Sequence, residues 1–168
     1  MLSQTQVPMQ IQPQIRNTVR ALIRHQDRLL MIQKFSPEKG VYFGLPGGEL
    51  EPNESLEQAV ERECQEELSA EVQVGSMVWV ADYYRKRTGS KDVYRHIVDH
   101  VFHCQLKGRY APQNGPEPDR HQQAVMWVPE DYLNDVYLAE PYLLKRLANL
   151  SAKPRSAYVG AYQDDPNG

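Results

Sequence analysis

The chain has 168 residues, a length typical of one compact domain, and its formal net charge at neutral pH is −3. Such a chain has no overall positive field for a long nucleic acid or an acidic membrane, so we expect neither as a partner. No apolar run approaches the roughly 20 residues of a membrane span, and the N-terminus lacks the charged-then-apolar order of a signal peptide. These features predict a cytoplasmic protein.

The two cysteines, Cys64 and Cys104, lack the close spacing of a zinc site. We expect reduced thiols, which are typical of the cytoplasm, and one disulfide between them is the alternative. A domain of this size buries enough apolar surface to fold without a disulfide.

The two ends of the chain differ in composition from its middle. Residues 1–14 are rich in Gln and Pro and predict a flexible arm, or an edge strand that becomes ordered on a partner. This arm makes a homodimer a candidate assembly. Residues 154–168 predict a loose tail, which leaves 15–153 as the folded domain.

Within the domain, runs of β-branched and aliphatic residues predict strands, and a period near 3.6 residues predicts helices. The first two strands form a hairpin around a polar turn at 25–27. The predicted strands are 16–24, 28–34, 41–45, 72–84, 93–106 and 124–128. The predicted helices are 55–68, a short helix opened by Pro129, and an apolar-striped helix at 139–150. This mixture predicts an α+β fold in which helices are packed on a mixed sheet.

The helix at 55–68 carries the strongest chemical signal. Ser55 and Gln58 match a capping box, which encodes the start of the helix locally. The first turns place apolar residues on one face, and at about 100° per residue the next turn places Glu63, Glu66 and Glu67 on that same face. Carboxylates at this spacing repel one another, and an inward face removes their hydration.

A divalent cation would relieve both penalties, because Arg62 is the only cation that the helix supplies. Ligands that are all hard oxygens favour Mg²⁺, with Mn²⁺ as the second choice. The alternative is a solvated acidic end of a surface helix. The preceding Pro46-Gly47-Gly48 leaves the backbone open for close approach, so a carbonyl there could also face an ion, although an ordinary tight turn explains such a sequence equally well.

The segment from Gly48 to Ala70 resembles the Nudix box, written G-x5-E-x7-R-E-U-x-E-E-x-G-U, where U is a bulky aliphatic residue. The matching charged and glycine positions are Gly48, Glu54, Arg62, Glu63, Glu66 and Glu67. The opening hairpin, the LPGG before the box and a late Trp127-Val128-Pro129 are also similar to the Nudix hydrolase family. The resemblance implies a Nudix-like α/β/α sandwich, in which the box helix and a C-terminal helix pack on a mixed β-sheet.

Three positions depart from the box. Cys64 stands at the aliphatic position, Ser69 replaces the glycine after the helix, and Ala70 is small where a larger residue is usual. A left-handed helix cap at Ser69 would cost roughly 1 kcal/mol relative to glycine. The departures therefore concern the turn after the helix and leave the acidic positions intact.

The resemblance implies roles for the box residues. The expected metal ligands are the helix glutamates and one backbone carbonyl: Glu63, Glu66, Glu67 and Gly48. Glu54 and Arg62 are expected to form an ion pair that orients these ligands and to belong with them to the catalytic set. The general base is expected to be Glu66 or Glu67, or else an acid from the Pro- and Gly-rich loop at 105–122, where Glu117 and Asp119 are the candidates.

The substrate is the least determined feature. Phe43 and Tyr84 are candidates to stack on a base, although aromatic residues in strands are more often core residues. Arg85, in a short basic run, is the candidate for a substrate phosphate. We expect hydrolysis of a diphosphate bond in a nucleoside diphosphate linked to another moiety, such as a nucleoside triphosphate or ADP-ribose. A Nudix-fold module that senses nucleotides without cleaving them is the alternative, and an isomerase would require catalytic groups that the sequence does not reveal.

Overall fold

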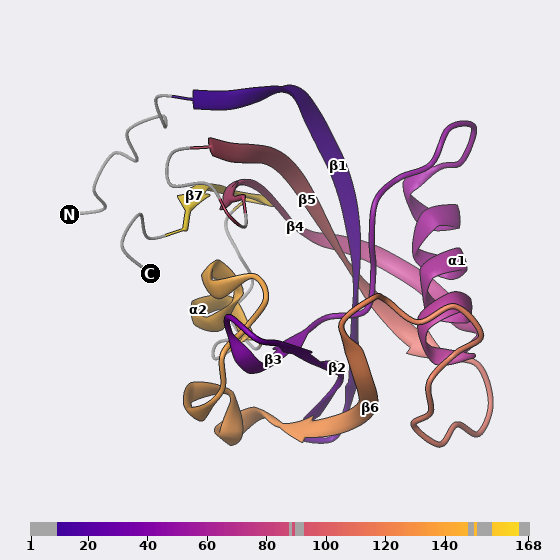
Figure 1. Ribbon diagram of the computed structural model, residues 1–168. Helices are drawn as coiled ribbons and strands as arrows, with labels where there is room; N and C mark the ends of the chain where they lie inside the picture. The colour runs from indigo at the N-terminus through magenta and orange to yellow at the C-terminus, as the bar shows by residue number, and fades with distance from the viewer. Residues whose placement is uncertain (1–9, 88, 90–92, 148–149, 151–155, 165–168) are drawn as a thin grey trace.

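The computed structural model describes residues 10–87, 89, 93–147, 150 and 156–164. They form a mixed β-sheet with helical segments on both faces (Figure 1). The strands are β1 (Gln10–His25), β2 (Arg28–Ser36), β3 (Gly40–Gly44), β4 (Val72–Lys86), β5 (Val93–Leu106), β6 (Gln122–Pro129) and β7 (Tyr158–Gln163). The helices are α1 (Leu56–Leu68) and α2 (Leu144–Leu147), with 3₁₀ segments η1 (Glu130–Asp135) and η2 (Pro141–Leu143). In these ranges no helix is both long and apolar enough to cross a membrane.

The sheet has the strand order β3-β2-β1-β5-β4-β7, and β6 pairs with β2. β1 runs parallel to β5 and β4 runs parallel to β7, whereas the other pairs are antiparallel. β1 and β2 pair only beside their turn, at Arg24 with Leu29 and His25 with Arg28. The sheet therefore opens into two halves beyond this turn, with β2, β3 and β6 in one half and the long strands β1, β5 and β4 in the other (Figure 1).

The turn after β3 fills the hydrogen-bonding edge of β1 that β2 leaves open. The Val19 N–H donates to the Gly48 carbonyl at 2.9 Å, and the Ala21 N–H donates to the Pro46 carbonyl at 2.8 Å. Gly47 lies between them with φ of 142°, and a Cβ atom there would be 2.0 Å from the Val19 carbonyl oxygen. Only glycine permits this approach, so the Pro-Gly-Gly sequence is more than an ordinary tight turn.

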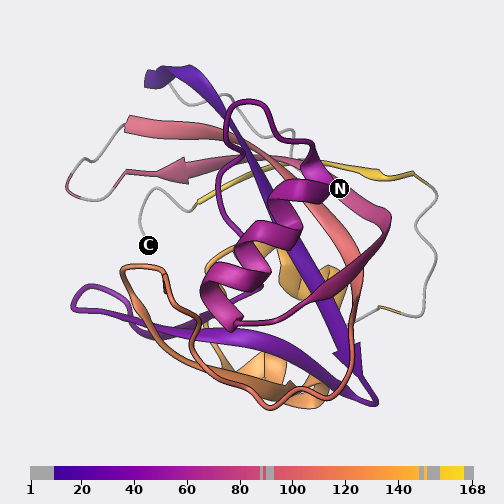
Figure 2. The same ribbon diagram turned by 90° about the vertical axis from the view of Figure 1, so that its right-hand side faces the viewer.

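Apolar side chains pack on both faces of the long strands. One cluster lies between the sheet and the segments η1, η2 and α2, and it includes Leu22, Phe43 and Tyr83. The other lies beneath α1 and includes Val19 and Cys64. Figure 2 looks directly onto α1, which covers only part of its face of the sheet. The α/β/α arrangement expected from the resemblance is thus confirmed.

The two chain ends differ from the sequence prediction. An arm is predicted over 1–14, but β1 begins at Gln10, where its backbone pairs with Val93 of β5; residues 1–9 lie outside the described residues. A loose tail is predicted over 154–168, but β7 pairs with β4. That prediction is wrong for 158–163, because Asp164 accepts hydrogen bonds from the Tyr83 hydroxyl and the Lys86 N–H and so fixes this segment along β4.

The helix predicted at 139–150 is shorter than expected. It begins as the 3₁₀ segment η2 at Pro141 and continues as α2 from Leu144 to Leu147; residues 148–149 lie outside the described residues. Leu143 and Leu147 are almost fully buried, so the predicted apolar stripe is present. Pro129 precedes η1 and is the last residue of β6, so the short helix there begins one residue later than predicted.

The left-handed cap at Ser69 is present, with φ of 52° and ψ of 36°. We predict that Ser69→Gly raises the free energy of unfolding by roughly 1 kcal/mol, because glycine adopts this conformation without the steric cost of a Cβ atom. Urea unfolding would measure the gain. Ser69→Ala is the matched control, since it keeps the Cβ atom. An equal gain in both variants would contradict this explanation.

Candidate active site

The box helix begins where the sequence predicts. The Ser55 side chain accepts a hydrogen bond from the Gln58 N–H at 3.2 Å, and the Gln58 side chain accepts one from the Ser55 N–H at 2.8 Å. This reciprocal pair is a capping box, so the prediction is confirmed. Because the first turn is fixed, the residues that follow have a defined rotation about the helix axis.

That rotation turns two acids toward the sheet. Glu63 is 9 % exposed and Glu67 is 3 % exposed, and they lie on the same buried face as Ala59, Val60 and Cys64. Glu66 lies at the border of this face, with a side chain that is 31 % exposed. For Glu63 and Glu67, burial excludes the alternative of a solvated acidic surface.

The glycine turn contacts both buried acids. The Gly47 N–H donates to Glu67 Oε2 at 2.9 Å. A Cβ atom at Gly48 would be 2.4 Å from Glu63 Oε1, so the backbone at Gly48 lies close against this carboxylate. The Gly48 carbonyl accepts the Val19 N–H, which leaves its second lone pair for another ligand.

Arg62 links the remaining acids. Its guanidinium forms two hydrogen bonds with Glu54, at 2.8 and 3.0 Å, and also contacts Glu63 at 2.9 Å and Glu66 at 3.1 Å. A further bond joins Arg62 to the Glu49 carbonyl at 3.0 Å. The Glu54–Arg62 pair expected from the resemblance is present. Across the described ranges, no three acidic, histidine or cysteine side chains are gathered closely enough to hold a metal ion as they stand, and Arg62 occupies the space between the acids.

The buried position changes the acidity of these groups. Burial raises the pKa of Glu67 to about 7, although the charge of Lys34 and the Gly47 N–H act in the opposite direction. Burial also raises the pKa of Glu63 against the opposing effect of Arg62. Both side chains therefore resist ionisation when no cation is close, and a bound cation would favour their charged forms.

A second polar group, which the sequence analysis does not identify, supports the glycine turn from the other face of β1. Arg20 donates to the Gly47 carbonyl at 3.1 Å and forms ion pairs with Glu140 at 2.8 Å and Asp99 at 3.3 Å. All three side chains are more than 90 % buried. The Asp99 carboxylate also accepts the hydroxyl groups of Thr18 and Tyr142. The one available signal in the sequence is an arginine inside the apolar run of β1.

The loop before β6 closes over the end of α1. The Gly115 N–H donates to the Glu67 carbonyl at 2.8 Å, and the Glu117 N–H donates to the Glu66 carbonyl at 2.9 Å. The Asp119 carboxylate binds Lys34 Nζ at 2.8 Å. Burial alone would raise the pKa of Asp119, but Lys34 and the His121 N–H outweigh it, and the pKa lies below the ordinary value. Both candidate loop acids are thus near the helix end.

The predicted substrate contacts do not lie together. Phe43 is 7 % exposed and packs inside the apolar cluster with Tyr83. Tyr84 follows Tyr83 in β4 and points to the opposite face, where its ring stacks on His96 at 4.7 Å. Arg85 is on the Tyr83 face, and its charge acts on both Tyr83 and Tyr42. Of the three predicted contacts, Arg85 is the one whose charge acts on residues of both sheet halves, Tyr42 of β3 and Tyr83 of β4.

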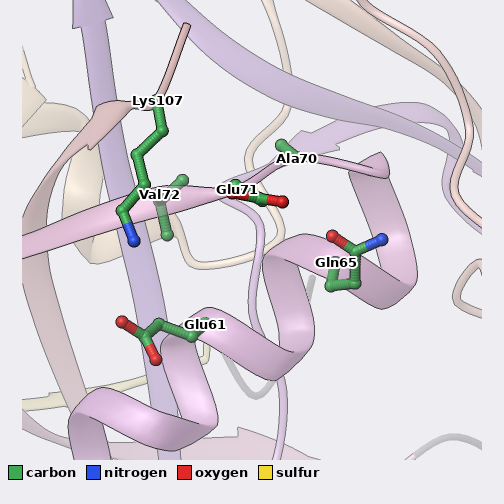
Figure 3. A pocket seen from close by; sticks show the side chains of 6 residues that line it. All are labelled: Glu61, Gln65, Ala70, Glu71, Val72 and Lys107. Carbon is green, nitrogen blue, oxygen red and sulfur yellow. The ribbon is translucent and has the colours of Figure 1, made fainter.

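A hollow lies on the outward side of α1, where the helix end meets the start of β4 (Figure 3). Glu61, Gln65, Glu71 and Lys107 line it together with two apolar residues. None of the inward acids is among its lining residues. This hollow is therefore separate from the box acids.

Comparison with known proteins agrees with this architecture. The NUDIX domain family model matches residues 14–148. The CTP pyrophosphohydrolase of Escherichia coli (strain K12) is 32 % identical over 140 residues, which cover 77 % of this chain and 93 % of that protein.

Solved structures give the same result. The solution structure of the E. coli ORF135 protein has a TM-score of 0.64 at 27 % identity, covering 85 % of this chain and 96 % of the other. A NUDIX hydrolase from Nitrosomonas europaea shares the fold, with a TM-score of 0.65 at 20 % identity over 82 % of this chain and 89 % of its own. The chain therefore belongs to the NUDIX family and is a Nudix pyrophosphohydrolase.

The raised pKa of Glu67 predicts a pH-dependent stability. A carboxyl whose folded pKa of about 7 exceeds the ordinary 4.5 favours folding when protonated, and this contribution is lost as the pH rises through about 7. With EDTA present to remove metal ions, the free energy of unfolding of Glu67→Gln should equal that of the wild type near pH 4.5. At about pH 8 it should be higher than that of the wild type by about 2–3 kcal/mol. Urea unfolding across this range would measure it.

Glu61→Gln is the control, because Glu61 lies on the exposed face of the same helix. This variant should keep the wild-type pH dependence. Parallel stability curves for Glu67→Gln and the wild type would contradict the assignment of the raised pKa to Glu67.

Proposed function

We propose that this chain is a Mg²⁺-dependent hydrolase that cleaves a diphosphate bond in a nucleoside diphosphate linked to another moiety. The observation that carries the proposal is the pair of buried acids, Glu63 and Glu67, held against the backbone of Gly47 and Gly48. Buried carboxylates in contact with open backbone are costly for stability and useful for binding a cation.

The donor groups fit a magnesium ion. The proposed ligands are the carboxylates of Glu63, Glu66 and Glu67 with the carbonyl of Gly48, all hard oxygens, and Mn²⁺ could replace Mg²⁺. Arg62 bridges Glu63 and Glu66, and this shared contact with one cationic group supports the proposal that they share a metal ion. When bound, the ion would draw the substrate phosphate oxygens together and offset charge at phosphorus.

The surrounding residues would keep the ligands in place. Glu54 holds the Arg62 guanidinium from the far side, so Arg62 can orient Glu63 and Glu66 without leaving the site. The Gly47 N–H holds one oxygen of Glu67 and leaves the other free. We assign the catalytic set to these four glutamates and Arg62.

The general base is assigned to Glu66 or Glu67. Glu66 has the more exposed carboxylate, which gives it access to a water molecule. Asp119 is a weaker candidate because its ion pair with Lys34 and its lowered pKa oppose protonation. Glu117 stays an alternative in the loop that binds the helix end.

A nucleoside triphosphate is the preferred substrate, because the E. coli relative is named a CTP pyrophosphohydrolase. ADP-ribose and similar compounds are the other members of the proposed class. The partner is therefore a small nucleotide. The cytoplasmic location and the homodimer that the sequence suggests for this protein remain predictions.

A panel of nucleotides tests the proposal. The wild type with Mg²⁺ should release phosphate-containing products from at least one nucleoside triphosphate, ADP-ribose or dinucleotide, and EDTA should abolish the release. Glu67→Gln should lower kcat by about a hundredfold or more, since it removes a charged group from the reaction site. Product chromatography and phosphate release would measure both effects.

Glu61→Gln again serves as the control and should keep full activity. Full activity in Glu67→Gln would overturn the metal assignment. Nucleotide binding without turnover of any member of the panel would overturn the proposed hydrolysis and favour a sensing module.

A further inference from the structure

Four arginines gather at one end of the long strands, and we call them the arginine group: Arg16, Arg85, Arg87 and Arg95. Arg85 of β4 and Arg95 of β5 are directly opposite each other in the antiparallel pair. Arg16 of β1 pairs with Ile97, which is two positions from Arg95 and so on the same face of β5. The strand order β1-β5-β4 therefore carries a row of guanidinium groups across one face of the sheet.

This row lacks acidic partners for most of its charge. Arg16 pairs with Glu49 at 3.2 Å, but in the described part of the chain Arg85, Arg87 and Arg95 form no ion pair. The Nε atom of Arg95 is shielded from solvent and has no hydrogen-bond partner among the described residues. Burial and then the charges of Arg16, Arg87 and Arg85 lower the pKa of Arg95. Opposed like charges destabilise a sheet, so an unneutralised row has a cost for folding.

The arginine group is next to the box. Glu49, which binds Arg16, directly follows Gly48, and its carbonyl accepts a hydrogen bond from Arg62. At the other end of the row, the charge of Arg85 acts on Tyr83 of β4 and on Tyr42 of β3, which belongs to the other half of the sheet. The row thus begins beside Glu49, the residue after Gly48, and crosses the strand face that also carries Ile97 and Tyr83.

We infer that the arginine group is a subsite for a phosphoryl group of the substrate that lies beyond the diphosphate held at the box. Guanidinium groups bind phosphate oxygens through paired, charge-assisted hydrogen bonds, and an anion there would supply the partner that Arg95 Nε lacks. The inference rests on the proposed function and narrows its substrate class to nucleotides with three or more phosphoryl groups.

A solvated basic surface is the competing explanation. It would place the guanidinium groups apart and in water, as for Arg109 in the loop after β5. The direct opposition of Arg85 and Arg95 and the shielded Nε atom do not fit that explanation.

Binding of inorganic tripolyphosphate to the full chain in EDTA tests the subsite without metal or hydrolysis. Isothermal titration calorimetry should detect binding to the wild type, and Arg85→Met and Arg95→Met should each weaken it by about tenfold. Arg109→Met is the matched control, because it removes the same charge from an exposed site, and it should bind as the wild type does. No binding to the wild type, or an equal loss in Arg109→Met, would overturn the subsite.

Hydrolysis kinetics separate this inference from the proposed function. With Mg²⁺, Arg85→Met should raise KM for a nucleoside triphosphate by about tenfold, and leave KM for a nucleoside diphosphate joined to a neutral sugar unchanged. An equal rise for both substrates would overturn the inference, because the arginines would then bind the diphosphate itself. If no nucleotide is cleaved, the proposed function fails, whereas the tripolyphosphate result in EDTA still decides the subsite.

Discussion

The close contact between the glycine turn and β1 is the constraint on which the site depends. β2 leaves β1 immediately after their shared turn, so the inner edge of β1 would expose its backbone groups. The backbone of Pro46 to Gly48 satisfies this edge in place of a strand. A side chain at Gly47 would collide with the Val19 carbonyl, so the opening of the sheet and the glycine turn require each other.

The contact between the glycine turn and β1 also determines where Glu63 and Glu67 meet the backbone. The turn presents one N–H to Glu67 and an open backbone to Glu63, while Arg20 fixes the Gly47 carbonyl from the opposite side. The turn therefore lies between the buried ion pairs of Arg20 on one side and the buried carboxylates of Glu63 and Glu67 on the other. The polar contacts that hold the turn lie among buried side chains, where water competes with them little.

The sequence predicts features that neighbouring residues encode, but it does not predict contacts between residues that are far apart in the chain. The capping box, the inward face of α1 and the left-handed Ser69 are encoded within a few residues of one another, so periodicity and turn chemistry reveal them. The grouping of Arg20, Asp99 and Glu140 depends on strand order, which no local pattern contains. For the same reason β7 is recognisable only once β4 offers it an edge.

β7 also has a consequence for the solubility of the protein. It pairs with β4 from Val80 to Tyr84, where the unpaired backbone of an edge strand would otherwise be a template for association with other chains. The Tyr83 hydroxyl and the Lys86 N–H donate hydrogen bonds to the Asp164 carboxylate just after β7, and the Tyr162 ring of β7 stacks on Tyr142. A short segment with little sequence signal thereby protects this part of the β4 edge from pairing with another chain.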